Sequence, residues 1–136
     1  MTYAQPGFES KICPPEQLTA RTAHIARPLV FTNGCFDILH RGHVTYLAQA
    51  AALGLSLVVA LNTDASVKRL GKGDDRPVNT LADRLAVMAS LECIALVTWF
   101  DEDTPLQRIL ECHPEILVKG GDWPVEKIVG CEEVRA

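Results

Sequence analysis

The sequence predicts the α/β fold class, with one domain built on a doubly wound, mostly parallel sheet. Three observations lead to this prediction. Apolar segments rich in strand-forming residues alternate with segments whose apolar residues recur at helical spacing. Polar residues and glycines gather after the apolar segments, where such sheets bind ligands. The 136 residues, 48% of them hydrophobic and 22% charged, suit a single buried core.

Four apolar segments are predicted to form strands, because each is rich in β-formers and bounded by loop residues. The predicted strands cover residues 29–31, 55–61, 94–100 and 116–118. The first is framed by Pro28 and by Asn33-Gly34, so it enters a loop directly after burial. We expect the third strand to be central in the sheet.

The segments between these strands carry apolar residues on one helical face. One predicted helix begins near Gly42 or His43 and ends before Gly54. A short second helix carries Val67 and Leu70, and Asp64 could cap it. Two more helices are predicted over residues 80–91 and 104–112. Residues 17–26 are a further helix candidate, which we interpret as a lid or packing arm rather than core. We therefore divide the chain into an N-terminal arm or helix, residues 1–28, and a main domain, residues 29–136.

Composition excludes several classes of function. The formal net charge of −4 argues against a general nucleic-acid surface. The chain has no apolar run near the roughly twenty residues that span a bilayer and no signal-like start, so we expect no membrane contact and a cytoplasmic location. The five cysteines are odd in number and lack a C-x-x-C pair, so buried thiols are expected rather than disulfides. Cys35 is the exception, because its loop should face a ligand.

The segment that follows the first strand predicts a triphosphate-binding corner. It runs through Asn33-Gly34 into His40 and His43, which lie three residues apart at a predicted helix start. A helix N-terminus attracts phosphate through its unpaired N–H groups and positive dipole end. Two imidazoles there add directed donors, and Gly42 between them permits close approach of a ligand to the backbone.

Further polar loops should converge on the same edge of the sheet. Residues 62–64 follow the second strand and residues 119–122 follow the fourth. The basic loop, residues 68–77, has Lys68, Arg69, Lys72 and Arg76 together with two glycines. It is either a solvated surface loop or a flexible segment that closes over phosphate and excludes water.

The His-x-Gly-His string resembles the signature of the cytidylyltransferase-like nucleotidyltransferases. More narrowly, residues 31–43, 62–64, 76–79 and 118–122 together resemble the bacterial heptose 1-phosphate adenylyltransferase branch. The resemblance implies a single Rossmann-like domain that transfers AMP from ATP to D-glycero-β-D-manno-heptose 1-phosphate, giving ADP-heptose and pyrophosphate for lipopolysaccharide core synthesis. It also implies Mg²⁺ bound through the ATP phosphates and a homodimer or higher homo-oligomer. We expect no protein-ligated metal, because the histidine pair has no second cluster with ligand spacing in the sequence.

The corner and the resemblance together assign the site. Catalysis is assigned to His40, His43 and Lys72. Nucleotide binding is assigned to Thr32, Asn33, Gly34, Cys35, Phe36, Gly42, His43, Arg84, Lys119, Gly120 and Asp122. Binding of the second substrate is assigned to Asp37, Asn62, Asp64, Lys72 and Arg76. The histidines would donate to phosphate oxygens during in-line attack on the α-phosphorus, so catalysis would be positioning plus electrostatics.

Several alternatives stay open at the level of sequence. Asp37 either helps to hold Mg²⁺ or orients a loop by accepting backbone N–H bonds. Arg84 either points toward the phosphates, as the resemblance implies, or is a solvent-facing charge or a salt-bridge partner of Asp83 or Glu92. The whole chain could instead be a cytidylyltransferase acting on glycerol 3-phosphate or another small phosphate ester, a non-catalytic nucleotide sensor, or a metal hydrolase built on His40, His43 and Asp37.

One departure from the family pattern concerns the C-terminal region. The resemblance implies a further strand, a Ser/Thr-rich turn of the Ile-Ser-Thr-Thr type and a final helix, and no Ser-Thr-Thr string occurs in this sequence. We expect either that the natural polypeptide is longer or that these residues lack part of the nucleotide pocket.

Overall fold

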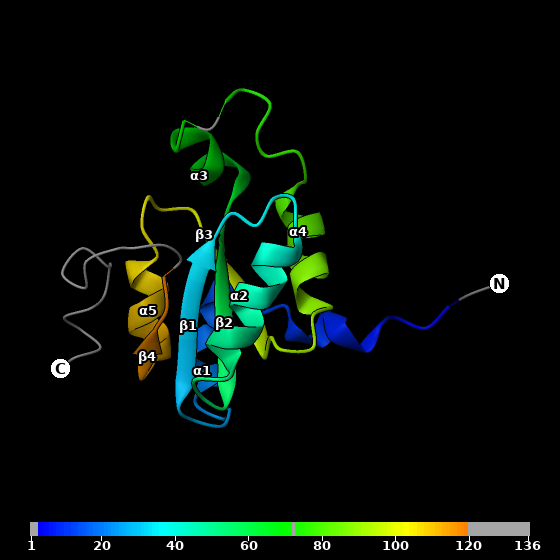
Figure 1. Cartoon of the computed structure of the whole chain (residues 1–136). Helices are drawn as coiled ribbons and strands as arrows, with labels where there is room; N and C mark the ends of the chain where they lie inside the picture. The colour runs from blue at the N-terminus through cyan, green and yellow to red at the C-terminus, as the bar shows by residue number, and fades with distance from the viewer. Residues whose placement is uncertain (1–2, 72, 120–136) are drawn as a thin grey trace.

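The computed structural model describes residues 3–71 and 73–119, which form a parallel sheet with helices on both faces (Figure 1). The strands are β1 (Leu29–Gly34), β2 (Ser56–Asn62), β3 (Leu96–Phe100) and β4 (Ile116–Leu117). The helices are the 3₁₀ helix η1 (Gly7–Lys11), α1 (Pro15–Thr22), α2 (Arg41–Ala51), α3 (Asp64–Arg69), α4 (Leu81–Ala89) and α5 (Leu106–Cys112). None of these helices has the length and apolar character needed to cross a membrane. The predicted α/β class is confirmed.

The strand order places a switch point beside β1. The order across the sheet is β3-β2-β1-β4, and every pair is parallel. The chain moves outward from β1 through β2 to β3 and then returns to the other side of β1 to form β4. The carboxyl ends of β1 and β4 therefore flank the position where ligands bind in doubly wound sheets.

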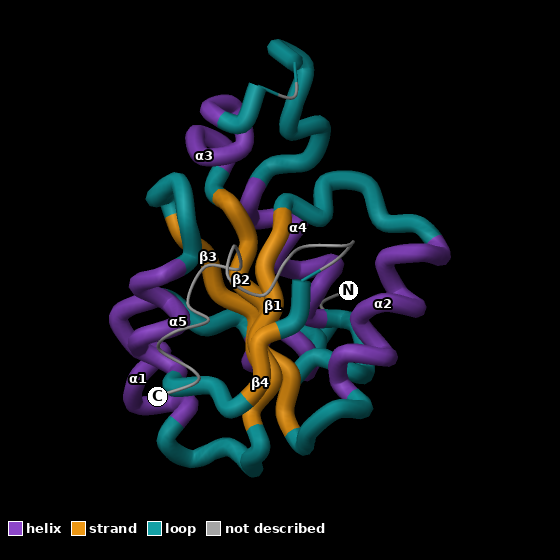
Figure 2. Tube along the Cα trace, turned by 60° about the vertical axis from the view of Figure 1, so that its left-hand side comes forward, coloured by secondary structure: helices purple, strands orange, loops and turns teal. Residues whose placement is uncertain are grey.

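Helices lie on both sides of the sheet (Figure 2), and alternate strand residues pack in two separate cores, one on each face. Val30 packs in one core with Leu47 of α2 and Met88 of α4. Phe31, the next residue, points to the opposite face and packs in the core that contains Leu18 of α1. Both faces of the sheet are apolar, as expected for a parallel sheet covered by helices.

Helix α1 belongs to the core, so its interpretation as a lid or packing arm is wrong. Leu18 has no exposed surface and Thr22 is 1% exposed. The Thr22 hydroxyl donates to the Leu18 carbonyl at 2.8 Å, which satisfies the buried side chain within the helix. The helix packs against α5 and β3, both distant in sequence. A short helix with few apolar residues gives no local sign of such burial.

Strand β3 lies at an edge of the sheet that the described residues form, against the prediction that it is central. Its apolar sequence is explained by the helices and the N-terminal segment that pack against it. Helices α1 and α4 pack against it, and Ile12 forms an isolated parallel bridge with Val97. The Cys13 N–H donates to the Val97 carbonyl at 2.8 Å, which pairs part of the exposed edge.

The helix starts differ slightly from the predicted ones. Thr63, not Asp64, caps α3, because its hydroxyl accepts a hydrogen bond from the Ser66 N–H at 3.2 Å. Asp64 is the first helical residue, and its carboxylate is used elsewhere. Helix α5 begins at Leu106 with Pro105 as its N-cap, later than the predicted start at residue 104.

Candidate active site

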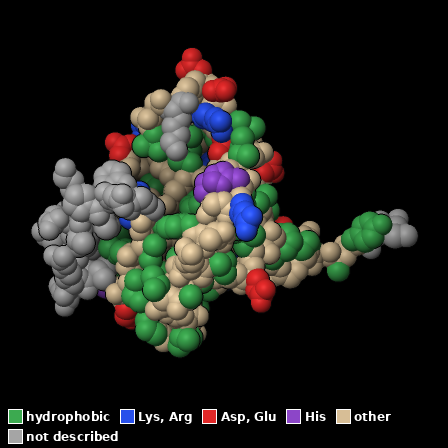
Figure 3. Space-filling view, in the orientation of Figure 1, with side chains coloured by type: hydrophobic (Ala, Val, Ile, Leu, Met, Phe, Trp, Pro, Cys, Tyr) green, Lys and Arg blue, Asp and Glu red, His purple; other side chains and the backbone are tan. Residues whose placement is uncertain are grey.

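A cavity of about 1040 Å³ opens at the carboxyl ends of β1 and β4, where the switch point lies. In the surface view, histidine side chains (purple) lie beside a hollow on this face (Figure 3). The described lining residues are Asn33, Gly34, Cys35, Phe36, Asp37, Ile38, His40, His43, Tyr46, Val67, Arg76 and Lys119. They come from the β1–α2 corner, from α3, from the basic loop and from the end of β4. The β1–α2 corner, the basic loop and Lys119 therefore meet at one edge, as predicted, whereas residues 62–64 are absent from the lining and residues 120–122 lie outside the described residues.

The two histidines begin α2 and bond to its first backbone N–H groups. His40 is the N-cap, and its Nδ1 accepts a hydrogen bond from the Gly42 N–H at 3.0 Å. The Nδ1 of His43 accepts one from the His40 N–H at 3.3 Å. A neutral imidazole has one protonated nitrogen, so an Nδ1 that accepts leaves the proton on Nε2. Both side chains thereby carry Nε2–H donors, which suit the oxygens of a phosphate.

Neighbouring rings fix the orientation of the histidines. The rings of His40 and His43 are stacked with their centroids 3.9 Å apart. Phe36 meets His43 edge to face at 5.4 Å. A Cβ at Gly34 would lie 2.8 Å from the Phe36 ring, so the glycine allows this arrangement. Phe36 itself has a φ of 46°, an unusual backbone conformation for a bulky residue, which is characteristic of functional corners.

Gly42 serves the histidine cap rather than the cavity in this structure. A Cβ at Gly42 would lie 2.8 Å from Cε1 of His40, so the space beside the glycine belongs to that ring. Gly42 does not line the cavity. The structure thus gives Gly42 a steric role in the cap, and close approach of a ligand to its backbone stays a prediction.

Asp37 faces the loop before α4. Its Oδ2 accepts from the Val78 N–H at 2.7 Å and from Arg76 at 3.3 Å, and its Oδ1 accepts from the Asn79 N–H at 2.8 Å. Partial burial alone would raise the pKa of Asp37, but these backbone donors and the guanidinium outweigh it and lower the pKa. Of the two roles left open by the sequence, the contacts match the orientation of a loop.

Arg84 is a buried clamp and does not line the cavity. The residue is 1% exposed, and its guanidinium donates to the carbonyls of Cys35 at 3.0 Å and Asn62 at 2.7 Å. It also pairs with the Asp64 carboxylate at 2.7 Å. The guanidinium bonds to these backbone and carboxylate oxygens and not to Asp83 or Glu92. The phosphate contact that the resemblance implies stays a prediction.

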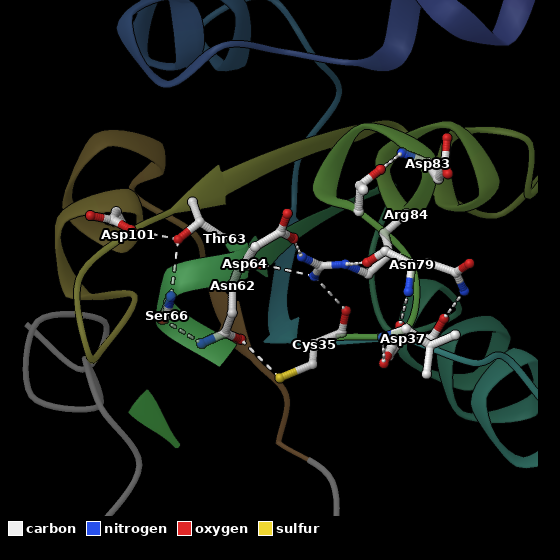
Figure 4. Close-up of polar contacts among 12 residues, drawn as sticks. Cys35, Asp37, Asn62, Thr63, Asp64, Ser66, Asn79, Asp83, Arg84 and Asp101 are labelled. Atoms are coloured by element: carbon white, nitrogen blue, oxygen red, sulfur yellow. Dashed lines mark hydrogen bonds and ion pairs between the residues drawn. The ribbon is translucent and has the colours of Figure 1, made fainter. Parts of the chain in front are cut away.

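A buried polar network surrounds this clamp (Figure 4). Asn62 is 4% exposed, and its amide donates to the Ser66 hydroxyl at 3.0 Å. Ser66 in turn donates to the Glu102 carbonyl at 3.0 Å. The Cys35 thiol donates to the Asn62 side chain at 3.6 Å. Asn62 and Asp64 therefore hold the loops together in this structure instead of lining the cavity.

The predicted site residues fall into three groups. Those that line the cavity are Asn33, Gly34, Cys35, Phe36, Asp37, His40, His43, Arg76 and Lys119. Those placed outside its lining are Thr32, Gly42, Asn62, Asp64 and Arg84. Lys72, Gly120 and Asp122 lie outside the described residues.

The sequence analysis missed Tyr46, which lines the cavity. Its hydroxyl is 2.6 Å from the Thr32 hydroxyl, which is fully buried behind the corner. Burial raises the pKa of the Tyr46 phenol, and the Thr32 hydrogen bond only partly offsets this. The available signal was spacing, because Tyr46 follows His43 by three residues and so lies on the same helical face.

The described residues contain no group of three or more His, Cys, Asp or Glu side chains placed to hold a metal ion. Both carboxylate oxygens of Asp37 accept hydrogen bonds from the loop. The Nδ1 atoms of His40 and His43 accept backbone hydrogen bonds. A hydrolase centre built on these three residues does not fit their contacts.

A doubly wound sheet with His-x-Gly-His at its switch point defines a nucleotidyltransferase type of site. The chain belongs to the cytidylyltransferase-like family, whose sequence model matches residues 31–134. The predicted family is thereby confirmed. Over 123 residues it is 58% identical to a D-beta-D-heptose 1-phosphate adenylyltransferase of Bordetella bronchiseptica, covering 89% of this chain and 76% of that protein.

Other relatives are longer proteins. The chain is 58% identical over 108 residues to the bifunctional protein HldE of a Marinomonas species, covering 79% of this chain and 22% of the relative. It is 53% identical over 129 residues to HldE of Campylobacter fetus, covering 95% of this chain and 28% of the relative. Among solved structures, a lipopolysaccharide core biosynthesis protein from Thermoplasma volcanium superposes with a TM-score of 0.61 at 30% identity, covering 69% of this chain and 78% of that one.

Proposed function

We propose that this chain transfers AMP from ATP to heptose 1-phosphate, giving ADP-heptose and pyrophosphate for lipopolysaccharide core synthesis. The observation that carries the proposal is the 58% identity, over 89% of the chain, with a relative named for this activity. The geometry supports the chemical class, because two Nε2–H donors and a helix N-terminus border one cavity. The choice of ATP as nucleotide and of heptose 1-phosphate as acceptor is inferred from the name of that relative.

The proposed mechanism is an in-line displacement without a covalent enzyme intermediate. An oxygen of the sugar phosphate attacks the α-phosphorus of ATP, and the bond to the pyrophosphate oxygen breaks on the opposite side. His40 and His43 donate hydrogen bonds from Nε2 to phosphate oxygens as charge moves to the leaving pyrophosphate. The capping bonds hold both donors before the substrate arrives, so little reorganisation is needed. Arg76 and Lys119 supply positive charge from other sides of the cavity.

Mg²⁺ is proposed to enter with the substrate as its complex with the ATP phosphates. The described residues fit this arrangement, since they offer cations and N–H donors at the cavity and no carboxylate cluster. Hard oxygen ligands on the triphosphate would suit Mg²⁺. The ion would neutralise charge on the triphosphate. A cytoplasmic location is proposed because the reaction consumes ATP, and a homo-oligomer remains a prediction.

CTP is the competing nucleotide, because the matching family is described as cytidylyltransferase-like. A nucleotide sensor without turnover is a further alternative. The stacked, capped histidines argue against a sensor, since binding alone does not require two oriented donors.

Pyrophosphate release tests the proposal with the full chain, Mg²⁺, and each of ATP, CTP, GTP and UTP. Each nucleotide is paired with heptose 1-phosphate or with glycerol 3-phosphate. We expect release with ATP and heptose 1-phosphate at least about 100-fold above the other pairs, an order of discrimination that pocket contacts can supply. A preference for CTP, or for glycerol 3-phosphate, contradicts the proposal. ATP binding by calorimetry without release in any pair supports the sensor.

A further inference from the structure

The loop before α4 is tied to the histidine corner through a single residue, Asp37. Its carboxylate accepts the N–H groups of Val78 and Asn79 and a bond from Arg76. Its backbone carbonyl accepts from the Asn79 amide at 2.7 Å. These contacts join positions 39 to 42 residues apart in the sequence. They make Asp37 the anchor of residues 76–79 at the cavity wall.

The same loop is also fixed from behind. The Asn79 carbonyl accepts from Nε of Arg84 at 3.0 Å. Arg84 continues to the carbonyls of Cys35 and Asn62, so one connected set of bonds runs from the corner through the loop to the end of β2 (Figure 4). The side chain of Asp37 is only 9% exposed, which strengthens its bonds. These three hydrogen bonds use most of the roughly four acceptor positions of the carboxylate.

The contacts of Asp37 fix the position of Arg76 at the cavity. It lines the cavity, its side chain is 39% exposed, and one of its nitrogens pairs with Asp37. A guanidinium has five N–H donors, so this pairing leaves donors suited to a phosphate. In an in-line transfer the attacking phosphate approaches opposite the leaving pyrophosphate. With His40 and His43 assigned to the triphosphate, a cation carried by a separate loop suits the attacking group.

We propose that Asp37 is a positioning residue that holds Arg76 against the phosphate of the acceptor sugar, and that it contacts neither metal nor sugar itself. This inference rests on the proposed function. It assigns recognition of the acceptor phosphate to the anchored loop, residues 76–79. The Asp37 charge, which would otherwise repel a phosphate, is compensated by its two N–H donors and the guanidinium.

The test substitutes Asp37→Asn, which keeps the shape but replaces one acceptor oxygen with an NH₂ donor. We expect KM for heptose 1-phosphate to rise about tenfold or more, the size of a lost charge-assisted hydrogen bond, with KM for ATP within about twofold. The Mg²⁺ dependence should be unchanged. The matched control is Glu115→Gln, because Glu115 accepts a backbone N–H and an arginine in the same way far from the cavity. That variant should leave both KM values unchanged.

A double-mutant cycle with Arg76→Gln separates positioning from direct contact. If Asp37 acts through Arg76, the double variant raises KM for the sugar phosphate no more than Arg76→Gln alone. Multiplicative effects contradict the inference. So do a raised Mg²⁺ requirement, a rise confined to KM for ATP, or an unchanged KM for the sugar phosphate in Asp37→Asn.

Amide hydrogen exchange of Val78 and Asn79 provides a readout that does not need activity. Both amides should be protected in the wild type and in Glu115→Gln and should exchange faster in Asp37→Asn. Unaltered exchange in Asp37→Asn contradicts the anchor. If the wild-type chain releases no pyrophosphate with this sugar phosphate, the proposed function fails, and the exchange measurement still decides whether Asp37 anchors the loop.

Discussion

Two carboxylates near opposite ends of β1 have similar contacts and different consequences. Glu115 accepts the Leu29 N–H at 2.7 Å and pairs with Arg27 at 3.0 Å, while Asp37 accepts two N–H groups and pairs with Arg76. The partners of Glu115 belong to the framework at the amino end of β1. The partners of Asp37 belong to a loop at the cavity.

The difference teaches that contact chemistry alone does not reveal function. Arg27 also bonds to the carbonyls of Cys112 and His113 at 2.9 and 2.7 Å, so the Glu115 cluster joins the end of α5 to the sheet. The Asp37 cluster joins the histidine corner to a loop that has no strand or helix of its own. In parallel sheets the carboxyl ends bind ligands, so the position of a polar cluster separates a functional role from a structural one.

The largest expected effect at the carboxyl end follows from His43→Ala. Loss of one oriented donor should lower turnover about 100-fold to 1000-fold while the fold persists. Stability should fall by about 1 kcal/mol, because the variant also loses the bond to the His40 N–H. Pyrophosphate release and urea unfolding measure the two effects. His24→Ala, at an exposed histidine outside the cavity, is the control, and near-normal turnover in His43→Ala would refute the assignment.

Arg84→Met tests whether Arg84 stabilises the fold or binds substrate. Removing a buried guanidinium leaves the carbonyls of Cys35 and Asn62 without their donor, so unfolding should be easier by about 3 kcal/mol. Arg69→Met, at an exposed pair with Asp103, should cost less than about 1 kcal/mol. Denaturant midpoints compare the two variants. Unchanged stability with weakened ATP binding in Arg84→Met would instead support a phosphate contact.

Glu115→Gln should affect stability at the amino end of β1 without affecting the chemistry at the cavity. It weakens one charge-assisted pair and keeps an acceptor for the Leu29 N–H, so the expected loss of stability is about 1 kcal/mol. Pyrophosphate release should stay within about twofold of wild type once the protein is folded. A selective loss of turnover would mean that the two ends of β1 are not separable.

The smallest effect is a shared pH dependence. Burial by itself raises the pKa of both carboxyls, but backbone N–H donors and arginines lower the net pKa of Asp37 and of Glu115. A lowered folded pKa contributes stability that is present above the unfolded value of about 4 and is lost as pH falls through the folded pKa. Amide signals of Val78, Asn79 and Leu29 should therefore titrate below about pH 4. Midpoints at or above that value contradict these contacts.

The sequence predicted the fold well where local pattern determines structure. The four apolar segments became strands, and the histidine pair lies at the start of α2 as its spacing indicated. Two placements were wrong, the peripheral α1 and the central β3. Their burial depends on packing against segments distant in the chain, which periodicity does not reveal.

The candidate site was predictable at its corner and less so behind it. Histidines at a helix start have a local signature, whereas the Arg84 guanidinium bonds to carbonyls from two other segments, and carbonyls are the same in every residue. The role of Asp37 depends on its distance from Val78 and Asn79, which only the folded chain sets. Tyr46, which lines the cavity, has a local signal in the sequence, its helical spacing from His43.

We propose that the cavity at the carboxyl end of β1 catalyses transfer at the α-phosphorus of ATP. Heptose 1-phosphate labelled with ¹⁸O in its three non-bridging phosphate oxygens tests it, with products separated by mass spectrometry. All the label should be in ADP-heptose and pyrophosphate should be unlabelled, because the sugar phosphate oxygen forms the new bond to the α-phosphorus. Release of AMP or ADP without ADP-heptose, or label in pyrophosphate, would contradict it.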